Sequence, residues 1–310
     1  MRFALAGGIP YGKPISLVLS DGSIFKPRDY EVYGYTFFDV ICVGGSGGNG
    51  GHFQASLPEE PGGSPNYTWV GMGGAGGGGG FHRIAGPLSA LPDECPVVVG
   101  QGGAHGNSAA QPADTTVGQD GETSSFNTHT CYASGGKGGH PASFPYSGNM
   151  LVPWLGYPTG AGGGQGGRGN RLTAGNGAPG GNTSPGPPTS GNDGGLLYNG
   201  RVGIGGGGGC GGLARHGRIW SPATIGGIGA FDILDDSVMS SPRSPSIEPV
   251  TTERIGAGGA GGASVDVLTG LPQEFGRSFG GDSAGGRGGV VIALSADAGI
   301  YRSEDGSDGS

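Results

Sequence analysis

Charged residues are scarce in this sequence and long apolar runs are absent, and both features exclude classes of protein. Only 13% of the 310 residues are charged, and the formal net charge is −8. Because nucleic-acid binding depends on Lys and Arg that neutralise phosphates, this balance argues against a nucleic-acid partner. No run approaches the roughly 18 apolar residues of a membrane span, and the apolar stretch after Arg2 ends at Gly7, which is too short for a signal peptide. We expect synthesis in a cytoplasm and no membrane insertion.

Cysteine is also scarce. The four cysteines, Cys42, Cys95, Cys131 and Cys210, lie too far apart for a CxxC metal knuckle. This spacing predicts buried or half-buried thiols, with disulfides as the alternative. We expect no metal and no cofactor.

Glycine, by contrast, is abundant, with 78 residues, and proline adds 23. Such a composition usually indicates disorder. Here, however, the glycines keep a phase of two glycines and one other residue, which is clearest from Gly44 to His52. The same phase returns in residues 73–81, 135–140, 163–168, 205–213, 258–263 and 285–290. A regular period of this kind predicts ordered structure.

A period of three residues matches the polyproline II helix, which has three residues per turn and no hydrogen bonds within itself. Because buried peptide groups need partners, several such helices must lie side by side and bond to each other. Two glycines per turn supply faces without side chains, and the third residue is expected to point outward or into a junction. Valine at an inward glycine should therefore be far worse than a change at the third-position residues Ala75 or Cys210. The predicted scaffold glycines are Gly44, Gly47, Gly50, Gly74, Gly77, Gly207, Gly259 and Gly286.

The apolar stretches that adjoin the glycine blocks are typical of β-strands. Residues 37–43 alternate, with Phe38, Val40 and Cys42 on one face of the predicted strand. Further predicted strands are residues 15–19, 96–99, 264–268 and 290–294. No stretch shows helical periodicity of useful length. The sequence therefore predicts a mostly β fold, in which a β-sandwich or jelly-roll-like set of strands is combined with a bundle of polyglycine II helices.

The spacing of these elements predicts one compact unit. Residues 1–35 would form a lead segment with a short strand or attachment arm, residues 36–295 the glycine-rich domain, and residues 296–310 an acidic, mobile tail. We expect the strand near Val290 to pair with an early strand such as residues 37–43, which would close the domain.

Two strings look like enzyme motifs. Gly281 to Gly286 resembles the GDSGG sequence around the nucleophile of trypsin-like proteases, and Gly44 to Gly48 fits GxSxG. Such matches arise by chance in a glycine-rich chain, and none of the histidines lies in a recognisable partner motif for a serine nucleophile. We expect no enzymatic activity.

Segments rich in aromatic residues and proline separate the glycine blocks, and a rigid scaffold would carry its specificity there. Aromatic residues and Arg are favoured at interfaces, and aromatic faces suit sugar rings. The alternative is that these residues form a small core that caps the bundle. The predicted receptor contacts are Phe144, Tyr146, Trp154 and Tyr157 in residues 143–158, then Arg218 and Trp220, and finally Tyr67 and Trp69.

The order of these elements resembles the glycine-rich domain of phage minor tail proteins, especially those of phages infecting actinobacteria. The resemblance covers residues 30–295 and is carried by the strand-to-glycine junctions at 43–51, 97–103, 118–126, 135–139 and 286–294. The chain is also similar in principle to tail-tip adhesins of enterobacterial phages, in which loops between polyglycine helices touch the host receptor. The glycine-rich domain of the anaplastic lymphoma kinase receptor is similar as well, but that receptor has a signal peptide and a membrane span.

The resemblance implies a non-enzymatic virion protein of the phage tail, either a minor tail protein or a tail-tip or fibre protein. It would contribute to host recognition through the loops between glycine helices. Its partners would be other tail proteins and a host cell-surface glycan or protein, and a homotrimer is the expected oligomer. The alternative is a purely structural virion component, such as a capsid decoration or tail-assembly protein, without a host ligand.

Overall fold

Strands dominate the part of the chain that the computed structural model describes, namely residues 14–58, 66–110, 114–128, 130–142, 164–165, 167, 191–194, 196–197, 202–211, 213–215, 218–221 and 285–296. The strands are β1 (Ile15–Leu19), β2 (Ile24–Phe25), β3 (Phe37–Val43), β4 (Phe53–Pro58), β5 (Asn66–Gly71), β6 (Phe81–Pro87), β7 (Cys95–Val98), β8 (Ser124–Phe126), β9 (Cys131–Ala133), β10 (Leu196–Leu197), β11 (Val202–Gly203), β12 (Leu213–Arg215), β13 (Arg218–Ser221) and β14 (Gly289–Ser295). Helical structure in these residues is limited to α1 (Arg28–Glu31) and the 3-10 turn η1 (Leu88–Ala90). The fold is mostly β, as predicted.

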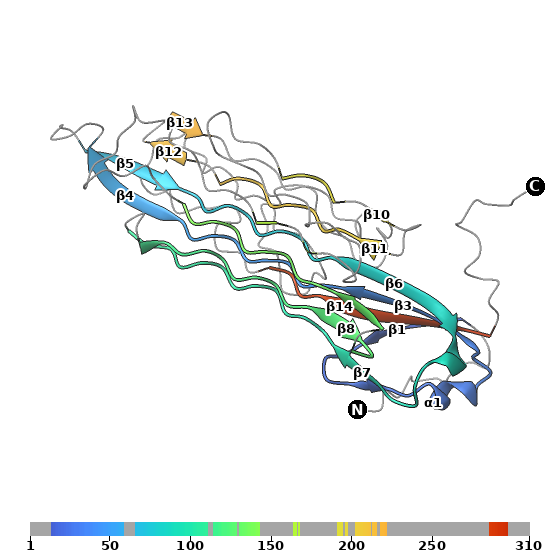
Figure 1. The fold of residues 1–310 in the computed structure, drawn as a ribbon. Helices are drawn as coiled ribbons and strands as arrows, with labels where there is room; N and C mark the ends of the chain where they lie inside the picture. Colours follow the sequence, from blue (N-terminus) through green and yellow to red (C-terminus); the bar gives the residue numbers. More distant parts are fainter. Residues whose placement is uncertain are drawn as a thin grey trace, which may run out of the picture.

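The strands form three antiparallel sheets that lie at two ends of an elongated molecule (Figure 1). A six-stranded sheet of order β1-β14-β3-β6-β11-β10 shares a core with a four-stranded sheet of order β2-β7-β8-β9. We call this pair the sandwich end. A second four-stranded sheet, of order β13-β12-β5-β4, lies at the opposite end, which we call the distal end. The glycine segments run side by side between the two ends (Figure 1).

The sandwich core is built from alternate residues of its strands. Phe38, Val40 and Cys42 of β3 are buried in one cluster with residues of the facing sheet such as Val97 and Phe126. Strand β14 pairs with the whole of β3, which confirms the predicted closure of the domain.

The lead segment predicted for residues 1–35 contains two strands of the sandwich. Strand β1 pairs with β14, and β2 pairs with β7, so both belong to the sandwich. The reason is the alternation in β1, where Leu17 and Leu19 pack against the core while Val18 between them is 56% exposed.

Residues 44–51 form a central glycine helix whose backbone hydrogen bonds all go to other segments. Every third residue of the helix bonds to the same neighbouring segment. Its N–H groups at 44, 47 and 50 donate to the carbonyls of 80, 77 and 74, and those at 45, 48 and 51 donate to 122, 119 and 116, all at 2.9–3.0 Å. The Ser46 N–H donates to the carbonyl of Gly286. The carbonyl groups of the central helix accept N–H groups from segments 100–109 and 134–142. Five segments therefore surround this helix, and the period of three is that of polyproline II.

Glycine is required at these contacts because neighbouring backbones touch. A Cβ atom at Gly44, Gly47 or Gly50 would overlap the carbonyl group of Ser134, Lys137 or His140, respectively. Backbone atoms of a packed neighbour cannot rotate away as a side chain can. Of the other predicted scaffold positions, Gly74, Gly77, Gly207 and Gly286 are buried and hydrogen-bonded across segments, whereas Gly259 lies outside the described residues.

The third residue of a triplet was expected to point outward or into a junction, and several third residues are buried inside the bundle. Ala75 and Cys210 are fully buried, so neither is a permissive position. Ser46 and Asn49 of the central helix are also buried. Their side chains are accommodated because the Ser46 hydroxyl donates to the Gly286 carbonyl and the Asn49 side-chain oxygen accepts from the Gly76 N–H. Third positions are exposed only where a helix lies at the surface of the bundle.

Two further segments of the bundle, 100–109 and 114–123, carry fewer glycines and were not predicted. Gly103 and Gly106 donate to the central helix, and Gly118 and Gly121 donate to segment 134–142. The intervening residues are mostly exposed. A helix at the surface of the bundle needs a bare face on one side only, so one glycine in every three residues is sufficient.

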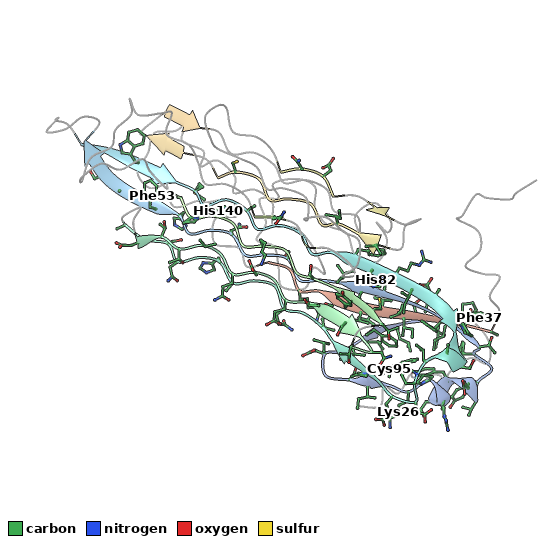
Figure 2. The ribbon with its side chains drawn as sticks, in the orientation of Figure 1. Lys26, Phe37, Phe53, His82, Cys95 and His140 are labelled. Carbon is green, nitrogen blue, oxygen red and sulfur yellow. The ribbon has the colours of Figure 1, made fainter. Side chains whose placement is uncertain are left out.

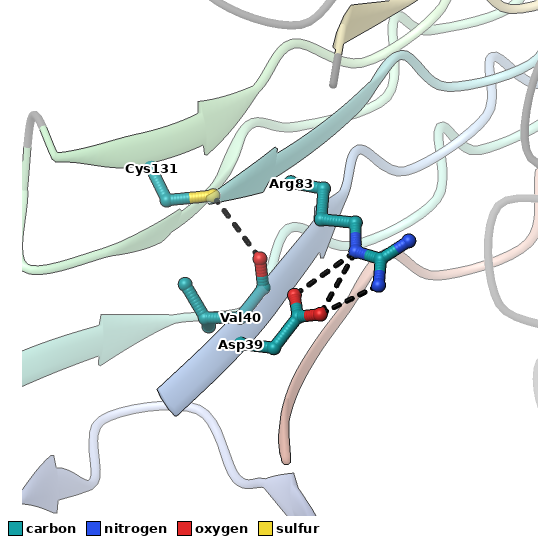
Figure 3. Close-up of polar contacts among 4 residues, drawn as sticks. All are labelled: Asp39, Val40, Arg83 and Cys131. Atoms are coloured by element: carbon teal, nitrogen blue, oxygen red, sulfur yellow. Dashed lines mark hydrogen bonds and ion pairs between the residues drawn. The ribbon is translucent and has the colours of Figure 1, made fainter. Parts of the chain in front are cut away.

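Polar groups on the two faces of β3 and β6 are satisfied in different ways. Asp39, whose side chain is 3% exposed, accepts a forked pair of bonds from Arg83, with Nη2 at 2.6 Å and Nε at 3.0 Å from Oδ2 (Figure 3). His82 is 4% exposed, and its Nδ1 accepts the backbone N–H of Tyr132 at 3.2 Å. Burial lowers the pKa of His82, so the imidazole is neutral near pH 7.

Replacing an inward glycine should cost far more than replacing a glycine elsewhere. Gly47→Ala places a methyl group against the backbone of Lys137, and we expect a loss of about 3 kcal/mol or more in the free energy of unfolding. Gly86→Ala is the matched control, because a Cβ there would meet only ring atoms of Phe38 at 3.5 Å and 3.7 Å. Urea unfolding of both variants tests this, and equal stability would contradict the packing.

Acid should destabilise the sandwich through His82. Unfolded histidine titrates near its ordinary pKa of 6.5, and the folded value is lower, so the unfolded state binds the extra proton more readily. The contribution of His82 to stability is full above pH 6.5 and is lost as the pH falls toward the folded pKa. Melting temperatures at about pH 7.5 and about pH 5.5 should fall less in His82→Gln than in the wild type. The exposed His140→Gln should behave as the wild type does.

Candidate functional site

The two ends of the molecule differ in which parts of the chain begin there. At the sandwich end, Ile15 pairs with Leu294 at the edge farthest from the bundle, so the described residues nearest both termini lie there. At the distal end, β4 leads into residues 59–65 and β13 into residues 222–284, which are not described. Residues 59–65 and 222–284 therefore both begin at the distal end, which lies opposite the described residues nearest the termini.

The distal sheet rests on a small set of buried side chains. Trp69 and Phe53 are fully buried, Ala55, Val70 and Met72 are 1–3% exposed, and the ring of Phe53 fills the space above Gly71. Trp69 on β5 lies opposite Ala55 on β4 and Arg215 on β12. This sheet is anchored directly to the central glycine helix, since β4 begins two residues after Gly51.

The structure brings together two pairs of predicted receptor contacts. Tyr67 and Trp69 lie on β5, and Arg218 and Trp220 lie on β13, with β12 between these two strands. The prediction that these residues occupy loops is wrong, because both stretches are strands. Trp69 is also buried completely, so it supports the sheet and is unavailable to a ligand. The next residue of β5, Val70, is buried as well, at 2% exposed.

The other predicted contacts, Phe144, Tyr146, Trp154 and Tyr157, lie outside the described residues. The residue before this segment, Ala142, is nevertheless fixed at the distal end. Its N–H donates to the carbonyl of Gly51 at 2.9 Å, and its carbonyl accepts the Thr115 hydroxyl at 3.1 Å. On the far side of the segment, Gly164 donates to Ala75 within the bundle.

A polar surface along the bundle was missed by sequence reasoning. Side chains of segments 100–109, 114–123 and 134–142 line its outer edge (Figure 2). Asp120 bonds to Lys137 and accepts the Gly138 N–H at 2.9 Å, and these bonds lower its pKa although partial burial acts in the opposite direction. Side chains also brace the segments, since the Gln101 N–H donates to Glu122 and the Asn107 N–H donates to Thr116. The sequence signal was a set of polar residues interspersed with single glycines, as with Asp120 and Glu122 on either side of Gly121.

Near the distal sheet, this surface carries a hydroxyl and an imidazole in contact. The Ser108 hydroxyl lies 2.7 Å from Nδ1 of His52 and accepts the His52 backbone N–H at 3.2 Å. Two bonds to one residue fix the hydroxyl in place and tie the end of segment 100–109 to the start of β4. The arrangement is a structural clamp at the base of the distal sheet.

Ser46, the serine of the GxSxG match, is buried in the central helix, and Ser283 of the other match lies outside the described residues. Within the described ranges, no group of three or more metal-binding side chains comes together. Nor does that part of the chain contain a helix long and apolar enough to span a membrane.

Comparison with known proteins places this architecture in a family. No curated protein matches the chain. Residues 29–295 match the family described as a glycine-rich domain, and the match runs from α1 to the end of β14. It thus takes in the bundle, the distal sheet and most strands of the sandwich. Because this match covers most of the sequence, the chain belongs to the glycine-rich domain family.

Proposed function

We propose that this chain is a structural protein of a phage tail, either a minor tail protein or part of the tail tip or fibre, and that it contributes to recognition of the host cell surface. The sandwich end would join other tail proteins, and the distal end would face the host. The protein would be made in the cytoplasm of the bacterial host and act in the virion without catalysis. Its copies would surround the tail axis, with a homotrimer as the expected assembly.

The observation that carries this proposal is the opposition of the two ends. The described residues nearest both termini lie at the outer edge of the sandwich, and the aromatic segment after Ala142 begins at the distal end. A protein that is attached at one end and presents a surface at the other requires this polarity.

Rigidity between the ends supports the same reading. The central helix is held on five sides by backbone bonds of 2.8–3.0 Å, so the distal sheet cannot swing relative to the sandwich without breaking several of them. A surface that is already ordered loses less entropy when it binds a ligand. The ligand would be a cell-surface glycan or protein, because aromatic and Arg side chains suit both.

Binding of the purified chain to intact bacterial cells tests the proposal. We expect Trp154→Ala combined with Tyr157→Ala to weaken binding at least about tenfold, since truncation of an aromatic anchor commonly costs 2 kcal/mol or more. The matched control is Tyr33→Ala, which removes an aromatic side chain, 38% exposed, from the sandwich end and should leave binding unchanged.

Unfolding temperatures of both variants should equal that of the wild type, which separates lost contact from lost fold. If both variants bind cells as the wild type does, the aromatic segment is not the contact. If the wild type binds no plausible host, the chain is instead a purely structural virion component, and its partners should then be sought among virion proteins.

A further inference from the structure

Two buried thiols from distant parts of the sequence meet in the sandwich core. The sulfur of Cys42, on β3, donates to the carbonyl of Cys131, on β9, at 3.4 Å. The sulfur of Cys131 in turn lies 3.3 Å from the carbonyl of His82 and 4.0 Å from that of Val40 (Figure 3). His82 is the residue directly opposite Cys42 in the β3–β6 ladder. Cys131 therefore lies over the ladder position that Cys42 occupies.

We propose that Cys42 and Cys131 are a disulfide-forming pair. This covalent modification would link β9 to β3 of the six-stranded sheet. The Cys42 sulfur contacts the backbone of Cys131, and the Cys131 sulfur contacts the backbone of the residue opposite Cys42, so the two side chains are neighbours in the core, as a disulfide requires. Both cysteines are free thiols in the structure, which is the reduced form of the site. This inference does not depend on the proposed function.

The other two cysteines are placed differently. The sulfur of Cys95, the first residue of β7, contacts the carbonyl of Pro92, three residues earlier in the chain, at 3.6 Å. Cys210 lies in the bundle segment 204–211, outside the sandwich. The described contacts join Cys42 to Cys131, and we expect oxidation to be specific to that pair.

Hydrogen peroxide is an oxidant small enough to reach a buried core. One thiolate attacks the peroxide oxygen, which forms a sulfenic acid and releases hydroxide. The second thiol then attacks this sulfur, the S–S bond forms, and water leaves. Overall, two thiols and one peroxide give one disulfide and two waters. Because burial raises the pKa of Cys131, the thiolate is rare at neutral pH, and the reaction should be slow and accelerate with pH.

The bond would close a loop of the intervening chain, since the two residues are 89 positions apart. Closing a loop of this size restricts the unfolded chain, and we expect the melting temperature to rise by roughly 5–10 °C. Reduction should reverse the change.

The test uses the full chain treated with hydrogen peroxide and then digested without reductant. Mass spectrometry should find one linked peptide pair, Cys42 with Cys131, lighter by two hydrogen atoms than the reduced peptides. Cys95→Ala should keep both the linkage and the rise in melting temperature, and Cys42→Ala should lose both. Sulfinic or sulfonic acids at Cys42 and Cys131 without a linkage would overturn the proposal, as would random linkage among all four cysteines. The peptide map of the wild type decides the matter even if Cys42→Ala fails to fold.

Discussion

Contact between bare backbones is the interaction on which the rest of this molecule depends. A polyglycine helix has no hydrogen bonds of its own, so each N–H and C=O within the bundle must find its partner in another segment. Gly47 illustrates the constraint: its N–H bonds to Gly77, and the space that a Cβ would fill is taken by the Lys137 carbonyl. Lateral bonding and the absence of side chains are thus one requirement, and it explains why glycine recurs with a fixed phase.

The sheets set the alignment of the helices. Val43 pairs with Phe81 at the end of the β3–β6 ladder, and the next bond in the same direction is that from Gly44 to Gly80 within the bundle. The register of two strands therefore continues into the register of two glycine helices. At the other end, segment 44–51 runs into β4, so the sandwich, the bundle and the distal sheet form one continuous framework. This continuity gives the molecule its two distinct ends.

Sequence reasoning succeeded where a pattern had one physical meaning. The alternation of residues 37–43 and the glycine phase of 44–51 predicted a buried strand that leads into a helix, and both are present. It failed where burial depends on neighbours. Whether Ala75 faces solvent is decided by how many segments surround its own, and no local pattern records that number. For the same reason the sequence predicted Trp69 to be a receptor contact at the surface, although its side chain is buried. Segments 100–109 and 114–123 escaped notice because a bundle's outer members need less glycine.

The bonds of the central helix also govern the order in which the chain can fold. Ser46 donates to Gly286, 240 residues later, and β3 and β1 both pair with β14, which follows both of them by more than 200 residues. Such non-local pairing makes folding slow, because long loops must close before any contact rewards them. Four of the five neighbours of the central helix lie within residues 73–142, and the fifth contact and β14 follow only when residues 285–295 have been made. The six-stranded sheet cannot be completed before β14 is available, and the glycine segments must stay soluble until then.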